Sequence, residues 1–335
     1  MIVTVTANPA IDRTLALPHE LARGEVQRLT GSESQAGGKG INVSRALRAS
    51  KLDNLAVFPA SAEDDFKHLV EAEGLRMLPV RIEGKVRTNF AVTETDGTTT
   101  KLNEPGPHLS TDEAAALVAA VVSASRDADW LVLAGSLPLG LHSSFYATLI
   151  EAVRAELGEA APRVAVDSSD APLEALLASG TRVQLIKPNA FELAELSGIA
   201  DGDALEADPQ LAADAAGWAL ENGADAVLAT LGGAGAIYRD ATTSLFATPP
   251  PTRVRSTVGA GDSSLAGYLL ASVTGATPER ALAQAVAHGS AAASLPGSGV
   301  PSPEQTQPDL VRITHLAVTG EHSNSIATST KENAS

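Results

Sequence analysis

The chain has 335 residues, of which 44% are hydrophobic and 19% charged, a composition typical of a globular protein with a large core. A formal net charge of -16 disfavours nucleic acid and membranes as partners, because phosphate-rich surfaces repel an acidic protein. The absence of cysteine excludes disulfides, thiolate metal sites and thiol nucleophiles. The N-terminal run carries no basic leader, and no window has the length of a membrane span, so we expect a cytoplasmic protein.

Short apolar runs rich in β-branched residues alternate with Ala-rich segments of helical period along most of the chain. This alternation predicts an α/β fold in which helices cover both faces of a mainly parallel sheet. The expected strands are 2–6, 55–59, 130–134, 163–167, 183–187 and 226–230. The expected helices are 112–125, 143–157, 172–178, 190–196, 212–222, 260–273 and 278–294.

Two segments, near 11–34 and 86–104, depart from this strand–helix alternation, because their residues alternate with a period closer to two. The second contains a Thr-Asp-Gly-Thr hairpin turn signal at 95–98. We expect the two segments to form a small antiparallel sheet, which either closes as a lid or extends an edge of the fold. We expect residues 1–318 to form one domain and the polar tail 319–335 to be disordered.

Phosphate-handling motifs direct attention to the last third of the chain. The P-loop pattern is absent, but Gly259-Ala260-Gly261 precedes a long apolar helical run that starts near Asp262. Small residues at a helix N-terminus favour an anion, and Asp262 in the first turn would accept a proton from an attacking hydroxyl. Taken alone, a Gly-rich turn with an Asp helix cap is the commoner explanation of this stretch.

Two other expected strands end in polar or Gly-rich residues. The stretch 187–189, Lys-Pro-Asn, ends one strand and precedes a helix containing Glu192. Asn189 and Glu192, three residues apart, suit water-mediated binding of Mg²⁺. A helix cap and a solvated Glu explain the same residues. The Gly-rich stretch 230–235 follows another strand and would approach a nucleotide closely, although a plain hairpin explains it too.

The first third of the chain supplies a Gly-rich loop and several cations. The stretch 37–40, Gly-Gly-Lys-Gly, leads into a helix, a shape suited to anions. Arg87 and Lys101 lie in the second irregular segment, each with an Asn two residues later, and Asp12 follows the first strand. Any one of these is usually a solvated surface residue, but their combination in an acidic chain indicates an anion site.

Together these motifs resemble the ribokinase-like (PfkB) carbohydrate kinases over about residues 1–300. The two hallmark regions of that family are matched by 37–42, Gly-Gly-Lys-Gly-x-Asn, and by 257–263, Thr-Val-Gly-Ala-Gly-Asp-Ser. The resemblance implies a ribokinase-like three-layer α/β/α fold with a small antiparallel β lid. Five further segments are similar to the branch of the family that acts on fructose 1-phosphate, namely 6–12, 87–89, 103–107, 135–138 and 187–192.

The resemblance also implies a role for each candidate residue. It implies that Asp262 is the catalytic base and that Gly259, Ala260 and Gly261 form an anion hole. Contacts with the sugar phosphate are implied for Asp12, Gly38, Lys39, Asn42, Arg87, Asn89, Lys101, Asn103 and Ser136. Contacts with ATP are implied for Lys187, Asn189, Glu192, Thr230, Gly232, Gly235, Gly289 and Ser290, with Glu192 also binding Mg²⁺ through water. A monovalent cation such as K⁺ would lie near Ser256, Val258 and Ala292.

The implied reaction is ATP-dependent phosphorylation of fructose 1-phosphate to fructose 1,6-bisphosphate. Asn103 favours this substrate by resemblance, whereas Lys101 stands where some relatives carry Arg, which leaves the position of the sugar's phosphate open. Tagatose 6-phosphate, fructose 6-phosphate and an unphosphorylated sugar remain alternative substrates, and a non-catalytic sugar-phosphate sensor is the alternative from another class. An exposed face of the lid sheet predicts a homodimer formed through the lid.

Overall fold

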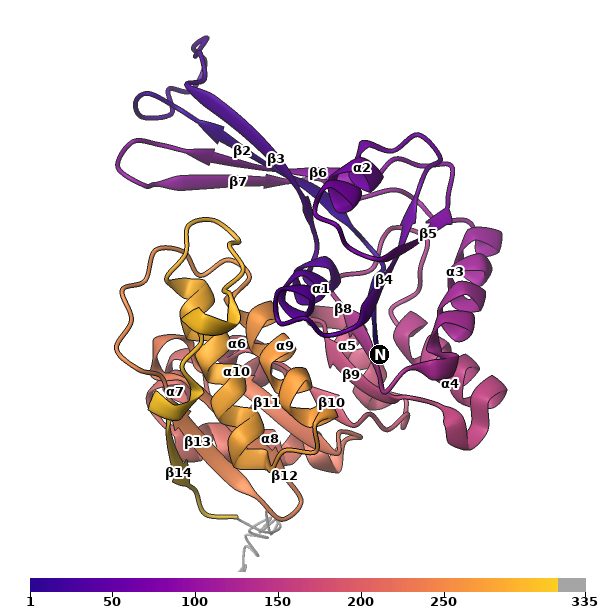
Figure 1. The fold of residues 1–335 in the computed structure, drawn as a ribbon, viewed down its shortest axis with the longest axis vertical. Helices are drawn as coiled ribbons and strands as arrows, with labels where there is room; N and C mark the ends of the chain where they lie inside the picture. Colours follow the sequence, from indigo (N-terminus) through magenta and orange to yellow (C-terminus); the bar gives the residue numbers. More distant parts are fainter. Residues whose placement is uncertain (319–335) are drawn as a thin grey trace, which may run out of the picture.

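The structure, a computed structural model, describes residues 1–318, so the predicted disordered tail 319–335 lies outside the described residues. Two sheets form its framework, a ten-stranded large sheet and a four-stranded small sheet that projects from it (Figure 1). The strands are β1 (Ile2–Thr6), β2 (Ala10–Ala16), β3 (Gly31–Gly37), β4 (Asn54–Ala60), β5 (Met77–Arg81), β6 (Arg87–Thr93), β7 (Thr99–Asn103), β8 (Trp130–Ala134), β9 (Arg163–Asp167), β10 (Leu185–Ile186), β11 (Ala226–Thr230), β12 (Ala236–Asp240), β13 (Ser244–Thr248) and β14 (Arg312–His315). The helices are α1 (Lys39–Ala49), α2 (Asp65–Ala72), α3 (Thr111–Ala124), α4 (Phe145–Leu157), α5 (Asp170–Ala178), α6 (Ala190–Ser197), α7 (Gly202–Ala207), α8 (Pro209–Glu221), α9 (Ala260–Val273) and α10 (Pro278–Ala293).

The large sheet has the strand order β14-β13-β12-β11-β10-β9-β8-β1-β4-β5. From β5 to β11 every neighbouring pair is parallel, and β12, β13 and β14 continue the sheet with antiparallel pairs. All residues of β1 and β8 are buried, as expected for strands covered on both faces. The mainly parallel α/β sheet predicted from the sequence is therefore confirmed.

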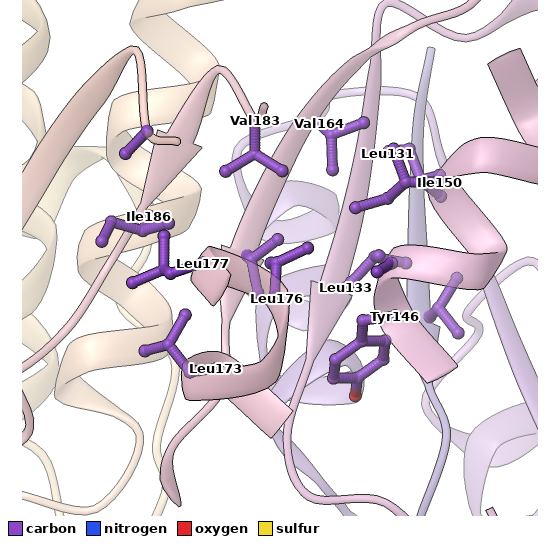
Figure 2. Packing of buried hydrophobic residues seen from close by; sticks show 14 of the residues in the cluster. Leu131, Leu133, Tyr146, Ile150, Val164, Leu173, Leu176, Leu177, Val183 and Ile186 are labelled. Atoms are coloured by element: carbon purple, nitrogen blue, oxygen red, sulfur yellow. The ribbon is translucent and has the colours of Figure 1, made fainter. Parts of the chain in front are cut away.

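Helices cover the two faces of the large sheet as two distinct layers. One face packs against α3, α4, α5, α6 and α8, where Leu133 and Val166 of the sheet contact Tyr146 and Leu176 of the helices. Figure 2 shows this layer, with side chains from strands and helices interdigitating. The other face packs against α1, α9 and α10. The three-layer arrangement agrees with the fold that the family resemblance implied.

The small sheet has the strand order β3-β2-β6-β7 and contains both irregular segments of the sequence. The predicted turn at 95–98 joins β6 to β7, with the Glu94 amide donating to Thr98 O over 2.9 Å. The outer pairs are antiparallel, but the central pair β2–β6 is parallel. Strand β2 follows β1 and strand β6 follows β5 in the chain. Since β1 and β5 run in the same direction in the large sheet, β2 and β6 also run in the same direction.

Several element boundaries differ from the expected ones for local reasons. Asp12 follows the first strand, as expected, and lies within the next strand, β2. The strand expected at 183–187 is reduced to Leu185–Ile186, because the Gln184 side chain accepts the Val164 amide at 2.8 Å in place of a ladder bond. Helix α8 begins at Pro209 and not at 212, since Asp208 caps it and proline suits a first helical position.

Candidate active site

The N-terminus of α9 forms the centre of the candidate site. Gly259 is the N-cap with φ of 76°, a left-handed conformation that glycine adopts without strain. The first amides of a helix have no partner within it. The Ala260 amide donates to Thr257 O at 3.3 Å, so the amides that follow it, of Gly261 and Asp262, are the ones best placed to meet an anion. A Cβ on Gly261 would lie 3.3 Å from Lys187 Nζ, which places an ammonium group beside these amides.

Asp262 lies in the first turn of α9 and is buried. Its Oδ2 accepts a 2.8 Å hydrogen bond from Asn42 Nδ2 of α1. Burial, followed by the nearby negative charge of Asp167, raises the pKa of Asp262 to about 6, although the Asn42 bond and two lysines oppose the rise. A carboxylate with a pKa near neutrality is well matched to general-base chemistry.

A buried ion cluster joins the Gly-rich loop to the strand ends. Asp167, the last residue of β9, is fully buried, with Oδ1 2.7 Å from Lys39 Nζ and Oδ2 3.1 Å from Lys187 Nζ. Burial opposes ionisation of Asp167, but Lys187 and then Lys39 outweigh it and hold its pKa below the usual value. Sequence reasoning missed Asp167; the available signal was a carboxylate closing an otherwise apolar strand.

A second cluster lies where the small sheet meets the large one. Asn89 Nδ2 of β6 donates to Asp12 Oδ1 of β2 over 3.0 Å. A Cβ on Gly37 would lie 2.2 Å from Asp12 Oδ2, so only glycine allows this carboxylate its position. Burial raises the pKa of Asp12, and the Asn89 bond and then the charges of Arg45, Arg87 and Lys101 partly offset the rise.

Arg87 and Ser136 are connected through Asn8, a buried residue at the carboxyl end of β1. Arg87 Nη1 donates to Glu104 O at 3.1 Å and Nη2 to Asn8 O at 3.4 Å. Asn8 Nδ2 donates in turn to Ser136 Oγ at 3.3 Å. Asn8 figures in the sequence-based prediction only within the segment 6–12, and its position after a buried strand was the signal for a structural role.

Three buried polar atoms of these residues have no hydrogen-bond partner within residues 1–318: Asn8 Oδ1, Arg87 Nε and Asn89 Oδ1. Buried polar atoms of folded proteins are nearly always paired, so a polar ligand or water would complete this set. Lys101 and Asn103 lie on the neighbouring strand β7, and both are exposed. The structure thus places Arg87 among these buried polar groups but leaves Lys101 and Asn103 exposed on the neighbouring strand.

The pair Asn189 and Glu192 forms a reciprocal helix cap on α6. Glu192 N donates to Asn189 Oδ1 at 2.9 Å, and Asn189 N donates to Glu192 Oε2 at 2.8 Å. Glu192 Oε1 lies outside the cap, 3.9 Å from Lys39 Nζ. Within the described chain no three His, Cys, Asp or Glu side chains are grouped to hold a metal directly. The free oxygen of Glu192 fits a cation held through water.

The Gly-rich stretch 230–235 is a hairpin between β11 and β12, so the plainer of its two explanations describes its backbone. Thr230 ends β11, and Gly232 and Gly235 both have positive φ. A Cβ on Gly235 would lie 1.9 Å from Ala247 O, so glycine is required by the neighbouring strand. These glycines therefore have a structural reason that is independent of any nucleotide.

Helix α10 contributes the remaining predicted positions. A Cβ on Gly289 would lie 2.1 Å from Ser264 Oγ, so this glycine permits close packing against α9. Ser290 lines a cavity of about 260 Å³ together with the loop 250–253, and its Oγ lies 2.6 Å from Thr252 Oγ1. Ser256 N donates to Ala293 O at 3.2 Å, which places Ser256 at the residue that follows Ala292, and Val258 N donates to Ser256 Oγ at 3.3 Å.

Comparison with known proteins gives a consistent result. The family described as pfkB family carbohydrate kinase matches residues 5–305. The chain is 34% identical over 281 residues to a 1-phosphofructokinase of Xanthomonas campestris, covering 82% of this chain and 85% of that protein. It is 33% identical over 326 residues to a 1-phosphofructokinase of Haloferax volcanii, covering 95% and 98%.

A solved structure with a similar fold is phosphofructokinase-2 from Escherichia coli in complex with substrates and products. It has a TM-score of 0.81 and 31% identity, covering 91% of this chain and 96% of that one. Other structures of the same enzyme are a tetrameric inhibited form and complexes with fructose-6-phosphate and with potassium. None of the helices within residues 1–318 combines the length and apolar character that a membrane crossing requires.

Proposed function

Because the chain belongs to the pfkB family of carbohydrate kinases, we propose that it transfers the γ-phosphoryl group of ATP to fructose 1-phosphate. The products are fructose 1,6-bisphosphate and ADP. The observation that carries the proposal is Asp262, a buried carboxylate with a raised pKa in the first turn of a helix whose cap is Gly-rich. Relatives named 1-phosphofructokinase support the choice of sugar phosphate.

In the proposed reaction Asp262 takes the proton of the sugar's free primary hydroxyl as its oxygen attacks the γ-phosphorus. The new O–P bond forms while the bond to the β-phosphate oxygen breaks, and ADP leaves. Phosphoryl transfer depends on positioning and on neutralising charge, which the amides of Gly259, Ala260 and Gly261 would supply. Lys187 and Lys39 would add positive charge beside that anion hole.

The sugar phosphate would bind between the two sheets. Arg87, Lys101 and Ser136 would hold its phosphate, and Asp12 and Asn42 its hydroxyls, with Gly38 and Lys39 lining the same space. The unpaired Arg87 Nε and the unpaired amide oxygens of Asn8 and Asn89 support this assignment, because a phosphate accepts and hydroxyls donate hydrogen bonds. Asn103 would contribute at the open edge.

ATP would lie along the carboxyl ends of the strands, bounded by Lys187, Asn189, Thr230, Gly232 and Gly235. Its base would enter the cavity beside Gly289 and Ser290, which the 260 Å³ volume supports. Mg²⁺ supplies charge neutralisation to the phosphates when bound, and the free oxygen of Glu192 would hold it through water. K⁺ would bind the carbonyls near Ser256, Val258 and Ala292, and a potassium complex of a relative supports it.

A substrate panel tests the proposed function directly. ADP release is measured with fructose 1-phosphate, fructose 6-phosphate, tagatose 6-phosphate and free fructose, with Asp262→Asn as the inactive control. We expect the largest kcat/KM with fructose 1-phosphate. Fructose 6-phosphate is the second candidate, favoured by the likeness to an enzyme solved with that ligand. Sugar-phosphate binding without ADP release would instead identify a sensor.

We propose a homodimer formed through the small sheet and a cytoplasmic location. Leu102 on β7 and Val26 in the β2–β3 connection are exposed, which supports burial of this region in an assembly. Light scattering on Leu102→Glu tests the assembly: the wild type should have twice the mass of the variant. An unchanged mass would rule out this surface as the interface.

A further inference from the structure

Arg45 occupies a central position behind the candidate base, although no sequence motif drew attention to it. It lies on α1 three residues after Asn42, and its side chain is only 10% exposed. Its Nη1 donates to Asn42 Oδ1 over 2.8 Å, and its Nε and Nη2 donate to the two carboxylate oxygens of Glu73. Nη2 also donates to Ala36 O near the end of β3.

These contacts determine which way the Asn42 side chain faces. A guanidinium has only donors, so the group of Asn42 that meets Arg45 must be the carbonyl oxygen. The NH₂ group then faces Asp262, where it makes its 2.8 Å hydrogen bond. A flipped amide would place its oxygen against the carboxylate and would lose both hydrogen bonds. The bidentate pair with Glu73 holds the guanidinium itself in place.

We propose that Arg45 is a positioning residue for phosphoryl transfer, which locks the Asn42 amide in the orientation that donates a hydrogen bond to Asp262. The inference rests on the proposed role of Asp262 as base and deepens it. Arg45 would touch neither the sugar nor ATP. Its effect reaches the carboxylate through one intervening side chain, and its contact with Ala36 O ties the same amide to the small sheet.

Loss of the Asn42 orientation should shift the pKa of Asp262 in a predictable direction. The Asn42 hydrogen bond lowers the pKa of Asp262, so disordering the amide would raise that pKa further. A base must be unprotonated, and the acidic limb of the rate profile would therefore move to higher pH. The charged or polar groups facing Asp262 are Asn42 and Lys39 from α1, Asp167 from β9 and Lys187 after β10. Those facing Arg45 are Glu73 after α2, Asp12 from β2 and Asn42.

Arg45→Met tests the inference, because it keeps an unbranched apolar stem and removes every donor. We expect the acidic limb of kcat/KM to move up by about one pH unit, the effect of one charge-assisted hydrogen bond. We expect kcat at pH 7 to fall about twofold, because the base would then be only about half unprotonated at that pH. The carboxyl ¹³C resonance of Asp262, assigned by its loss in Asp262→Asn, should titrate with the same shift. This resonance reports on the inference even if no sugar phosphate is turned over, so the two proposals fail separately.

Two further variants make the result decisive. Arg45→Met should add nothing to Asn42→Ala, since both remove the same hydrogen bond to Asp262. Arg48→Met is the matched control: it removes an exposed cation from the same helix and should leave the titration unchanged. If Arg45→Met does not fold, Glu73→Gln should give a smaller shift in the same direction. An unmoved resonance in the folded variant, or fully additive effects with Asn42→Ala, overturns the inference.

Discussion

The N-terminus of α9 and the small sheet form two sides of the candidate site, and they differ in how far they are exposed to solvent. Residues 262–269 of α9 are all buried, whereas four of the five residues of β7 are exposed. The proposed base, Asp262, therefore lies in a packed helical layer, whereas Lys101, one of the predicted cations, lies on a solvent-exposed strand. The difference predicts a division of labour, in which changes near α9 act on kcat and changes on the small sheet act on the KM of the sugar phosphate.

The largest effect should come from Asp262→Asn, which keeps the shape of the side chain and removes the proton acceptor. We expect kcat to fall by about 10²–10⁴, the usual contribution of a general base, with both KM values within about twofold of the wild type. Steady-state ADP release measures both quantities. A variant that keeps more than half of its turnover would refute the assignment of Asp262.

The second effect concerns the buried ion cluster that supports the α9 side. Asp167→Asn leaves Lys187 buried beside an uncharged partner, and breaking a buried pair costs about 3–5 kcal/mol of stability. The free energy of unfolding in urea measures it. Asp53→Asn is the matched control, because its ion pair with Arg76 is exposed and such pairs contribute about 0–1 kcal/mol. Equal losses in the two variants would show that Asp167 does not anchor the site.

The third effect belongs to the small sheet. Arg87→Ala should raise the KM of the sugar phosphate about tenfold or more, since hydrogen bonds to charged groups contribute about 1.5–3 kcal/mol, while the KM of ATP stays within about twofold. Arg13→Ala is the control, an exposed residue of the same sheet that hydrogen-bonds Ser34. Similar changes in both KM values of the Arg87 variant would contradict a role in sugar-phosphate binding.

The same contrast explains what could be predicted from the sequence. Periodicity gave α9 its observed limits, 260–273, and located the hairpin of β6 and β7, because both depend on neighbouring residues. The contributions of Asp167 and Arg45 could not be predicted, because they arise from tertiary contacts. Lys39 and Asp167 are 128 positions apart in the chain, and Asn42 and Asp262 are 220 apart. A carboxylate at the end of an apolar strand marks Asp167 as unusual but does not identify Lys39 as its partner, and Arg45 carries no comparable local signal.

The smallest effect should come from Lys101→Arg, at the exposed edge of the small sheet. Lys101 acts on the half-buried Asp12 only through its charge, and the substitution keeps that charge while adding a bidentate fork. We therefore expect the KM of fructose 1-phosphate to change by less than about threefold, in line with the weak contribution of exposed ion pairs. KM values for fructose 1-phosphate and fructose 6-phosphate are measured side by side. A tenfold change in KM, or a reversed preference between the two sugars, would show that β7, and not the cluster of Asp12, Arg87 and Asn89, selects the substrate.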